Sequence, residues 1–205
     1  MKVLMLNGSP KANGNTATAL KEMEKIFLQE GIEVETVQVG HLPVRGCIAC
    51  QACKKTGKCA FDDIVNVLAE KLEASDGLVL GSPVYYASAN GTLMAVLHRL
   101  FYSSRFSKQM KVGASVVAAR RGGLSATYDE LNKFFGISGM PIASSQYWNS
   151  VHGSAPGEAL QDAEGMQGMR TLARNMAFLM KSIALGKEKY GLPEREPMTA
   201  TNFIR

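Results

Sequence analysis

The chain has 205 residues, of which 46% are hydrophobic and 20% are charged, and its formal net charge is +5. This length suits one domain with a core of its own, while the absence of any run of about 18 apolar residues argues against a membrane-spanning helix. The first residues lack the pattern of a signal peptide, so we expect a cytoplasmic protein without a membrane partner. A net charge of +5 is compatible with nucleic-acid binding, but basic and acidic residues are mixed and no nucleic-acid motif occurs, so we expect no nucleic-acid partner.

Strand-like and helix-like segments alternate along the chain. Short apolar or alternating runs predict five strands, at Lys2–Leu6, Ile32–Val39, Gly77–Leu80, Val112–Ala119 and Met140–Tyr147. Between and after them, helical spacing of apolar residues predicts five helices, at Asn15–Glu30, Asp62–Ala74, Thr92–Tyr102, Leu124–Phe135 and Gly157–Ala184.

This alternation is typical of an α/β fold with a doubly wound, five-stranded parallel sheet. Right-handed crossovers place helices on both faces and favour the strand order 2-1-3-4-5. We expect one domain over residues 1–186, with a cysteine-rich insertion at 46–60. Residues 187–205 are polar, contain two prolines and predict a C-terminal arm.

The loop after the first strand has the composition of a phosphate cradle at a helix N-terminus. Gly8 and Gly14 permit tight turns. The groups that can bind a phosphate are the hydroxyls of Ser9 and Thr16, the positively charged side chain of Lys11, and the main-chain N–H groups of Asn15, Thr16 and Ala17. The loop matches neither a Walker A motif nor Gly-x-Gly-x-x-Gly, and it suits a phosphate monoester such as that of FMN. An ordinary turn with an Asn or Thr cap is the alternative.

Two further loops follow strands of the same sheet, and ligands bind at this edge of such folds. The first, Pro83, Val84, Tyr85 and Tyr86, offers an aromatic wall and main-chain N–H groups for a flavin ring. The second runs from Ala119 through Arg120 to Gly122 and Gly123, where glycines permit close approach and an arginine favours an anionic reduced flavin. The alternatives are tyrosines packed on the next helix and solvated arginines on a turn.

Three motifs resemble those of the NAD(P)H-dependent FMN reductase family, and more narrowly of its iron–sulfur flavoprotein branch: in chain order they are Gly-Ser-Pro-x4-Asn-Thr, Cys-x2-Cys-x2-Cys-x5-Cys and Ser-Pro-Val-Tyr-Tyr. The resemblance covers Lys2 to about Ala184 and implies a flavodoxin-like fold, bound FMN and assembly into homodimers or homotetramers. By position, it implies that Ser9, Lys11, Asn15, Thr16 and Ala17 hold the FMN phosphate, that Pro83 to Tyr86 border the isoalloxazine ring, and that Ala119 to Gly123 lie on its far side. One departure is Arg120-Arg121, where the family commonly has glycine and threonine.

All four cysteines lie within 13 residues, at Cys47, Cys50, Cys53 and Cys59. Together with the resemblance, this spacing favours a [4Fe–4S] cluster held by all four thiolates, with Lys54, Lys55 and Lys58 offsetting its charge. Zinc, a redox-active pair of unmetallated cysteines, and plain free thiols are the alternatives. Because the cysteines follow the second strand, we expect them at the sheet edge that carries the phosphate and tyrosine loops.

The functional hypothesis is an FMN-dependent oxidoreductase that takes a hydride from NADH or NADPH and passes electrons to a small-molecule acceptor or a redox protein, through the cluster where it is present. Since the flavin performs the chemistry, no acid–base catalytic residue is expected. The alternatives are a non-catalytic FMN and iron–sulfur electron carrier and a cluster-free flavin or quinone reductase. Trp148 and His152, which follow the last strand, are candidates for lining the nicotinamide or acceptor pocket.

Overall fold

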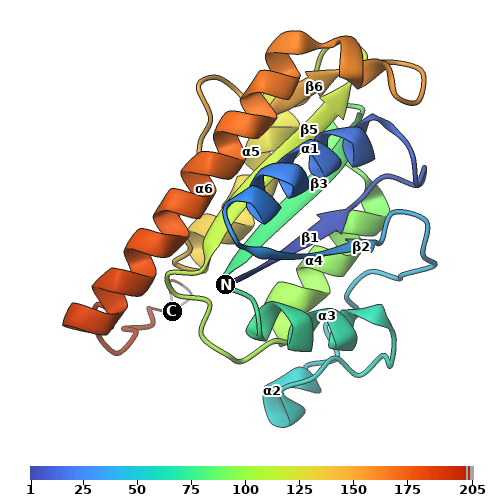
Figure 1. Ribbon diagram of the computed structural model, residues 1–205. Helices are drawn as coiled ribbons and strands as arrows, with labels where there is room; N and C mark the ends of the chain where they lie inside the picture. The colour runs from blue at the N-terminus through green and yellow to red at the C-terminus, as the bar shows by residue number, and fades with distance from the viewer. Residues whose placement is uncertain (202, 204–205) are drawn as a thin grey trace.

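A six-stranded sheet lies between two layers of helices in the computed structural model, which describes residues 1–201 and 203 (Figure 1). The strands are β1 (Lys2–Asn7), β2 (Glu33–Gln38), β3 (Gly77–Tyr85), β4 (Ser88–Ala89), β5 (Val112–Ala119) and β6 (Ser150–His152). The helices are α1 (Asn15–Gln29), α2 (Cys53–Thr56), α3 (Ile64–Glu73), α4 (Gly91–Ser103), α5 (Leu124–Ile137), the 3₁₀ turn η1 (Glu158–Gln161) and α6 (Ala163–Tyr190).

The sheet order is β2-β1-β3-β5-β6, and all of these pairs are parallel. Counted as parallel strands in chain order, this is the predicted order 2-1-3-4-5. The additional strand, β4, pairs antiparallel with the end of β3 and lies off the main path. The predicted α/β class and doubly wound topology are therefore confirmed.

Helices cover both faces of the sheet, so the core has two halves. On one face, α1 and α6 contribute Met23, Phe27, Met169 and Met176 to a cluster that packs on Val79 and neighbouring strand residues. On the other, α3, α4 and α5 pack residues such as Leu68, Leu97 and Phe135 against the opposite side of the same strands. Burial on both faces explains why the central strands read as continuous apolar runs.

The predicted fifth strand at Met140–Tyr147 is wrong. Only one isolated bridge, between Ile142 and Gly113, forms in that stretch of the described chain. The segment then leaves the sheet through a turn in which the Asn149 side chain accepts the N–H of Ser145 (3.2 Å). The strand that pairs with β5 is β6, which begins at Ser150. A strand at the edge of the sheet needs few ladder hydrogen bonds, so two brief contacts, at Ile142 and at Ser150–His152, take the place of the longer strand that was expected.

The last helix also differs in extent from the prediction. A short 3₁₀ turn precedes it, α6 begins at Ala163, and it continues to Tyr190, four residues into the predicted arm. Beyond Gly191 the described residues have no regular structure, while residues 202, 204 and 205 of the predicted arm lie outside the description. Within the described part of the chain, we find no helix whose length and apolar character would let it cross a membrane.

Candidate functional site

The loop between β1 and α1 is folded by its own side chains. The Asn7 side chain accepts the N–H of Ser9 (3.0 Å), and the Ser9 hydroxyl accepts the N–H of Lys11 (3.1 Å). Gly14, the residue before α1, offers no side chain to cap the helix. The first N–H groups of α1 are left without intrahelical acceptors, and their partial positive charge faces the loop.

Close main-chain contacts fix the base of this loop between β2 and β3. Gly8 donates its N–H to the carbonyl of Gly81 (2.7 Å), and Gly40, just after β2, donates to Asn7 (3.2 Å). A Cβ atom at Gly40 would lie 2.1 Å from the Gly8 oxygen, and one at Gly8 would lie 2.7 Å from the Leu93 side chain. Both positions therefore require glycine, and they set the path of the phosphate loop.

The tyrosine loop is a tight hairpin. Tyr85 pairs with Ser88 across β3 and β4, so Tyr86 and Ala87 form a two-residue turn, with φ of 52° and 60°. This left-handed backbone is disfavoured for residues with a Cβ atom. Glu130 of α5 holds the hairpin by accepting the Ser88 hydroxyl (2.8 Å). Tyr85 is 47% exposed and lines a pocket, whereas the Tyr86 ring is fully exposed and does not line it.

The loop after β5 divides into two parts. Ala119 and Arg120 line the same pocket, but Gly122 and Gly123 do not. Gly123 has φ of +86° and lies under the hairpin, where an added Cβ would be 3.0 Å from Val84 Cγ1. Its place in the fold is explained by backbone geometry and packing against the hairpin.

A fourth segment, which the sequence analysis did not assign to the site, completes the pocket. Gly153, Ser154 and Pro156 follow β6 and line it. The Asn15 side chain ties this segment to α1, because its amide donates to the carbonyl of Ala155 (3.0 Å) and its oxygen accepts an N–H from η1. The sequence does indicate this segment, because a loop rich in serine, proline and glycine directly follows the last strand.

Together these loops surround an open pocket of about 200 Å³ at the carboxyl ends of β1, β3, β5 and β6. It is lined by Ser9, Lys11, Gly14, Asn15, Thr16, Pro83, Val84, Tyr85, Ala118, Ala119, Arg120, Gly153, Ser154 and Pro156. Nine of the thirteen residues predicted for cofactor binding are in this set; Ala17, Tyr86, Gly122 and Gly123 are not. The described lining holds two positive side chains and no carboxylate, which suits an anion.

Trp148 and His152 line a separate, smaller pocket of about 80 Å³. Asp162 accepts the main-chain N–H of His152 (2.7 Å) and lies 3.3 Å from its ring nitrogen Nδ1. Partial burial opposes ionisation of Asp162, but these contacts and the N–H of Gly165 outweigh it and lower the pKa of the carboxyl. His152, which lines this smaller pocket, directly precedes Gly153, which lines the larger one, so consecutive residues of the chain contribute to the two pockets.

All four cysteines line one pocket, with Phe61, Arg99 and Tyr102 among its other residues. Cys47 and Cys50 are exposed, on a segment without regular structure, and Cys53 begins the single-turn helix α2. In the described chain, no three His, Cys, Asp or Glu side chains are close enough to hold a metal ion. The set of four thiols around one pocket fits a tetrahedral thiolate site in its chemistry, and the segment must close to form one.

The cysteine pocket does not lie at the sheet edge where the sequence analysis expected it. It shares no lining residue with the pocket at the carboxyl ends of the strands. Three of its lining residues belong to the second half of α4, namely Arg99, Tyr102 and Ser103, whereas the start of that helix faces the carboxyl ends of the strands. Figure 1 shows α2 beyond the outer helices α3 and α4. After β2 the chain runs along the helix layer, because Arg99 holds it there.

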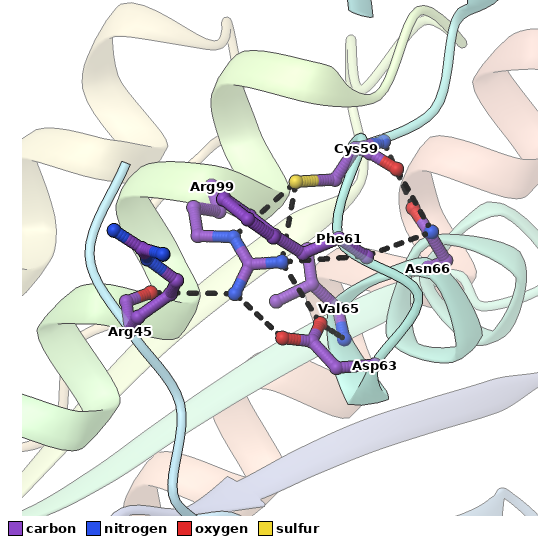
Figure 2. A network of polar contacts seen from close by, with 7 residues as sticks. All are labelled: Arg45, Cys59, Phe61, Asp63, Val65, Asn66 and Arg99. Atoms are coloured by element: carbon purple, nitrogen blue, oxygen red, sulfur yellow. Dashed lines mark hydrogen bonds and ion pairs between the residues drawn. The ribbon is translucent and has the colours of Figure 1, made fainter. Parts of the chain in front are cut away.

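The contacts of Arg99 are shown in Figure 2. Its guanidinium forms two hydrogen bonds with the Asp63 carboxylate, at 2.7 and 2.9 Å. Two further N–H groups donate to the sulfur of Cys59, from Nε at 3.3 Å and from Nη2 at 3.2 Å. Arg99 is 1% exposed, although arginine is seldom buried without partners. Cys59 is thus the one cysteine whose thiol is held by a buried side chain among the described residues.

Comparison with known proteins gives a consistent result. Residues 1–155 match the family model described as NADPH-dependent FMN reductase. A relative from Methanocaldococcus jannaschii, named iron–sulfur flavoprotein MJ1083, is 33% identical over 195 residues, covering 89% of this chain and 99% of that protein. Among solved structures, RosB with bound 8-demethyl-8-formylriboflavin-5′-phosphate has a TM-score of 0.70 at 18% identity, covering 100% of this chain and 94% of that one. A flavodoxin from the domain Archaea has a TM-score of 0.59 at 13% identity, covering 88% and 99% of the two chains.

Proposed function

The chain belongs to the NADPH-dependent FMN reductase family, and from that premise we propose that this FMN-dependent oxidoreductase takes a hydride from NADH or NADPH and passes electrons to an acceptor. The observation that carries the proposal is the pocket itself. One end offers the phosphate-type donors Ser9 and Thr16 at the start of α1, and the other brings Tyr85 and Arg120 from adjacent strands. This combination matches a ligand with a phosphate and a flat ring.

In this proposal the residues of the chain bind and orient. The first N–H groups of α1, the Thr16 hydroxyl and the Lys11 ammonium hold the phosphate, where the helix dipole adds to the attraction. The side chain of Asn15 is already engaged by the segment after β6, so its contribution is its main-chain N–H. Tyr85 forms a wall for the ring. Bound FMN supplies the hydride acceptor and the electron donor.

No acid–base residue is assigned to this chemistry. The described lining of the pocket contains no histidine, aspartate or glutamate, and its charged side chains are Lys11 and Arg120. A positive side chain next to the ring favours the more negatively charged, reduced state of the ligand. In this proposal the protein therefore contributes binding and electrostatics.

We propose further that Cys47, Cys50, Cys53 and Cys59 hold a [4Fe–4S] cluster that accepts single electrons. Support comes from four thiols lining one pocket and from the name of the Methanocaldococcus jannaschii relative. The nearby Lys54, Lys55 and Lys58 would offset the charge of such a cluster. A cluster-free flavin or quinone reductase remains the second candidate, favoured by the present separation of the thiols.

The test is anaerobic purification followed by metal and flavin analysis and assays with NADH and NADPH. We expect one FMN per chain, about four irons per chain and oxidation of at least one nicotinamide cofactor. Flavin without iron, but with turnover, would support the cluster-free reductase. Flavin and iron without oxidation of either nicotinamide would identify a non-catalytic electron carrier, and absence of flavin binding would overturn the central proposal.

We also propose that the chain forms a homodimer or homotetramer and delivers electrons to a small molecule or a redox protein. Helix α6 supports an assembly, because Phe178 and Leu185 are 70% and 67% exposed on it. Large exposed apolar side chains on one helix are common at subunit contacts. Light scattering of the FMN-bound protein would test this, and a monomeric mass would refute it.

A further inference from the structure

Arg99 is buried in a helix face where an apolar residue would be expected. It lies between Val96 and Leu100 of α4, both fully buried, and is itself 1% exposed. Burying a guanidinium costs several kcal/mol unless its charge is paired and its N–H groups are bonded. Asp63 supplies the paired charge. The burial of this side chain is therefore explained by the polar groups around it and not by packing alone.

All three guanidinium nitrogens donate hydrogen bonds to residues 45–63, the segment that carries the cysteines. Nη1 also donates to the carbonyl of Arg45 (3.3 Å), and Nη2 to that of Phe61 (3.5 Å). The Phe61 ring has two guanidiniums near it, that of Arg99 at 5.0 Å and that of Arg45 at 4.7 Å from the ring centroid. Figure 2 shows these groups converging on Arg99. One side chain of α4 thus fixes the chain on both sides of the cysteine segment.

Cys59 is held from its main chain as well as from its sulfur. Its N–H donates to the Asn66 side-chain oxygen (2.9 Å), and its carbonyl accepts the Asn66 amide (3.1 Å). The other three cysteines lie on the exposed segment or on α2. The four thiols are therefore unequal: the Cys59 sulfur accepts two N–H groups from a buried side chain, whereas among the other three only the Cys47 sulfur accepts a hydrogen bond in the described chain, from the main-chain N–H of Ala49 (3.4 Å).

We propose that Arg99 is a positioning residue for the cluster: it fixes Cys59 as the first ligand, and its two N–H···S bonds raise the cluster's reduction potential. This inference rests on the cluster in the proposed function. Hydrogen bonds to cluster sulfurs and a nearby positive charge stabilise the reduced state, which carries one more negative charge. Residues that orient metal ligands commonly change metal affinity 10- to 100-fold when they are replaced.

The experiment compares Arg99→Lys and Arg99→Met with the wild type and with Arg45→Met. Arginine 45 is exposed and stacks on the same ring, but its side chain donates no hydrogen bond to the Cys59 sulfur, so its variant is the matched control. Lysine at position 99 keeps the charge beside Asp63 but cannot reproduce the planar fork of donors. Each full-length protein is reconstituted anaerobically with iron and sulfide. Iron content, iron loss to a chelator and the midpoint potential by EPR-monitored titration are measured.

We expect both Arg99 variants to lose iron to the chelator at least tenfold faster and to show a lower midpoint potential, while Arg45→Met, which removes a charge but no N–H···S bond, retains iron like the wild type and lowers the potential less than either Arg99 variant. Arg99 variants with wild-type potential and iron retention would overturn the inference. Circular dichroism and FMN binding report folding; if Arg99→Met does not fold, Arg99→Lys decides, and failure of both to fold would assign Arg99 to folding alone and overturn the inference. A wild type that takes up no iron would instead refute the cluster itself, and the inference with it.

Discussion

Replacing Thr16 with valine tests the phosphate site with little change in shape. The Thr16 side chain is 1% exposed, and its methyl group packs over Gly81, where an added Cβ would be 3.0 Å from Thr16 Cγ2. Valine keeps this contact and loses only the hydroxyl. A hydrogen bond to a charged group contributes about 1.5–3 kcal/mol, and about 1.4 kcal/mol corresponds to tenfold in affinity. We therefore expect FMN to bind roughly 10- to 100-fold more weakly.

The assay is quenching of flavin fluorescence on titration of the apoprotein with FMN. Thr18→Val is the matched control, because the Thr18 hydroxyl donates to the carbonyl of Gly14 (3.3 Å) on the same helix and Thr18 does not line the pocket. Its FMN affinity should equal that of the wild type. Riboflavin, which lacks the phosphate, serves as a second control, since its affinity should not change in Thr16→Val.

Two results would refute this reasoning. An unchanged FMN affinity in Thr16→Val would place the phosphate away from the start of α1. An equal loss of riboflavin affinity would show that the hydroxyl acts on the ring end of the ligand or on the shape of the pocket.

Three further predictions concern the surroundings of the pocket. Tyr86→Asn should raise the free energy of unfolding of the apoprotein by about 1 kcal/mol in denaturant titrations, because asparagine tolerates the left-handed backbone at φ of 52°. It should also weaken FMN binding if the ring borders the flavin, as the sequence predicts; wild-type affinity would remove Tyr86 from the site. Gly40→Ala should destabilise the protein by more than about 3 kcal/mol and abolish FMN binding, since its Cβ would lie 2.1 Å from a main-chain oxygen of the phosphate loop; a stable, FMN-binding variant would contradict this close approach. The lowered pKa of Asp162 means that its contribution to stability is present above the unfolded-state pKa and lost as pH falls through the folded-state value. Asp162→Asn should therefore unfold more easily at neutral pH and show a flatter loss of stability below about pH 4 by thermal melts, and an unchanged pH profile would show that the carboxylate is not stabilised in the fold.

The sheet and its ligand edge could be predicted because both depend on local patterns. Buried parallel strands give continuous apolar runs, and the loops at their carboxyl ends meet at one edge whatever the details of the helices. This is why Ser9, Tyr85 and Arg120, which are far apart in the sequence, line one pocket. The rule assigns loops to an edge and does not resolve which residue of a loop faces the ligand, so the sequence predicts Gly123 in the pocket, whereas it packs under the hairpin.

Edges and turns were predicted less well, because a few main-chain contacts decide them. The hairpin at Tyr86 and Ala87 has none of the Asn-Gly signal that two-residue turns prefer, and Glu130 of a distant helix stabilises it instead. The predicted last strand, Met140–Tyr147, precedes the one that forms, because the actual pairing with β5 needs only the three residues from Ser150, which are too few to give a pattern in the sequence.

The cysteine segment shows the limit of reading spacing alone. The cysteine pattern indicates four ligands and their order, and the preceding strand indicates an edge of the sheet. Its actual position depends on Arg99, which lies 36 residues after Asp63 and 40 after Cys59 and which occupies a buried position of α4 with a charged side chain. A guanidinium can be buried at this position only if the cysteine segment supplies its hydrogen-bond acceptors. In turn, the segment can lie on α4 only if it is hydrogen-bonded to the guanidinium. Because each requires the other, neither is visible in its own stretch of sequence, and the position of the cysteine segment on α4 is a property of the folded chain.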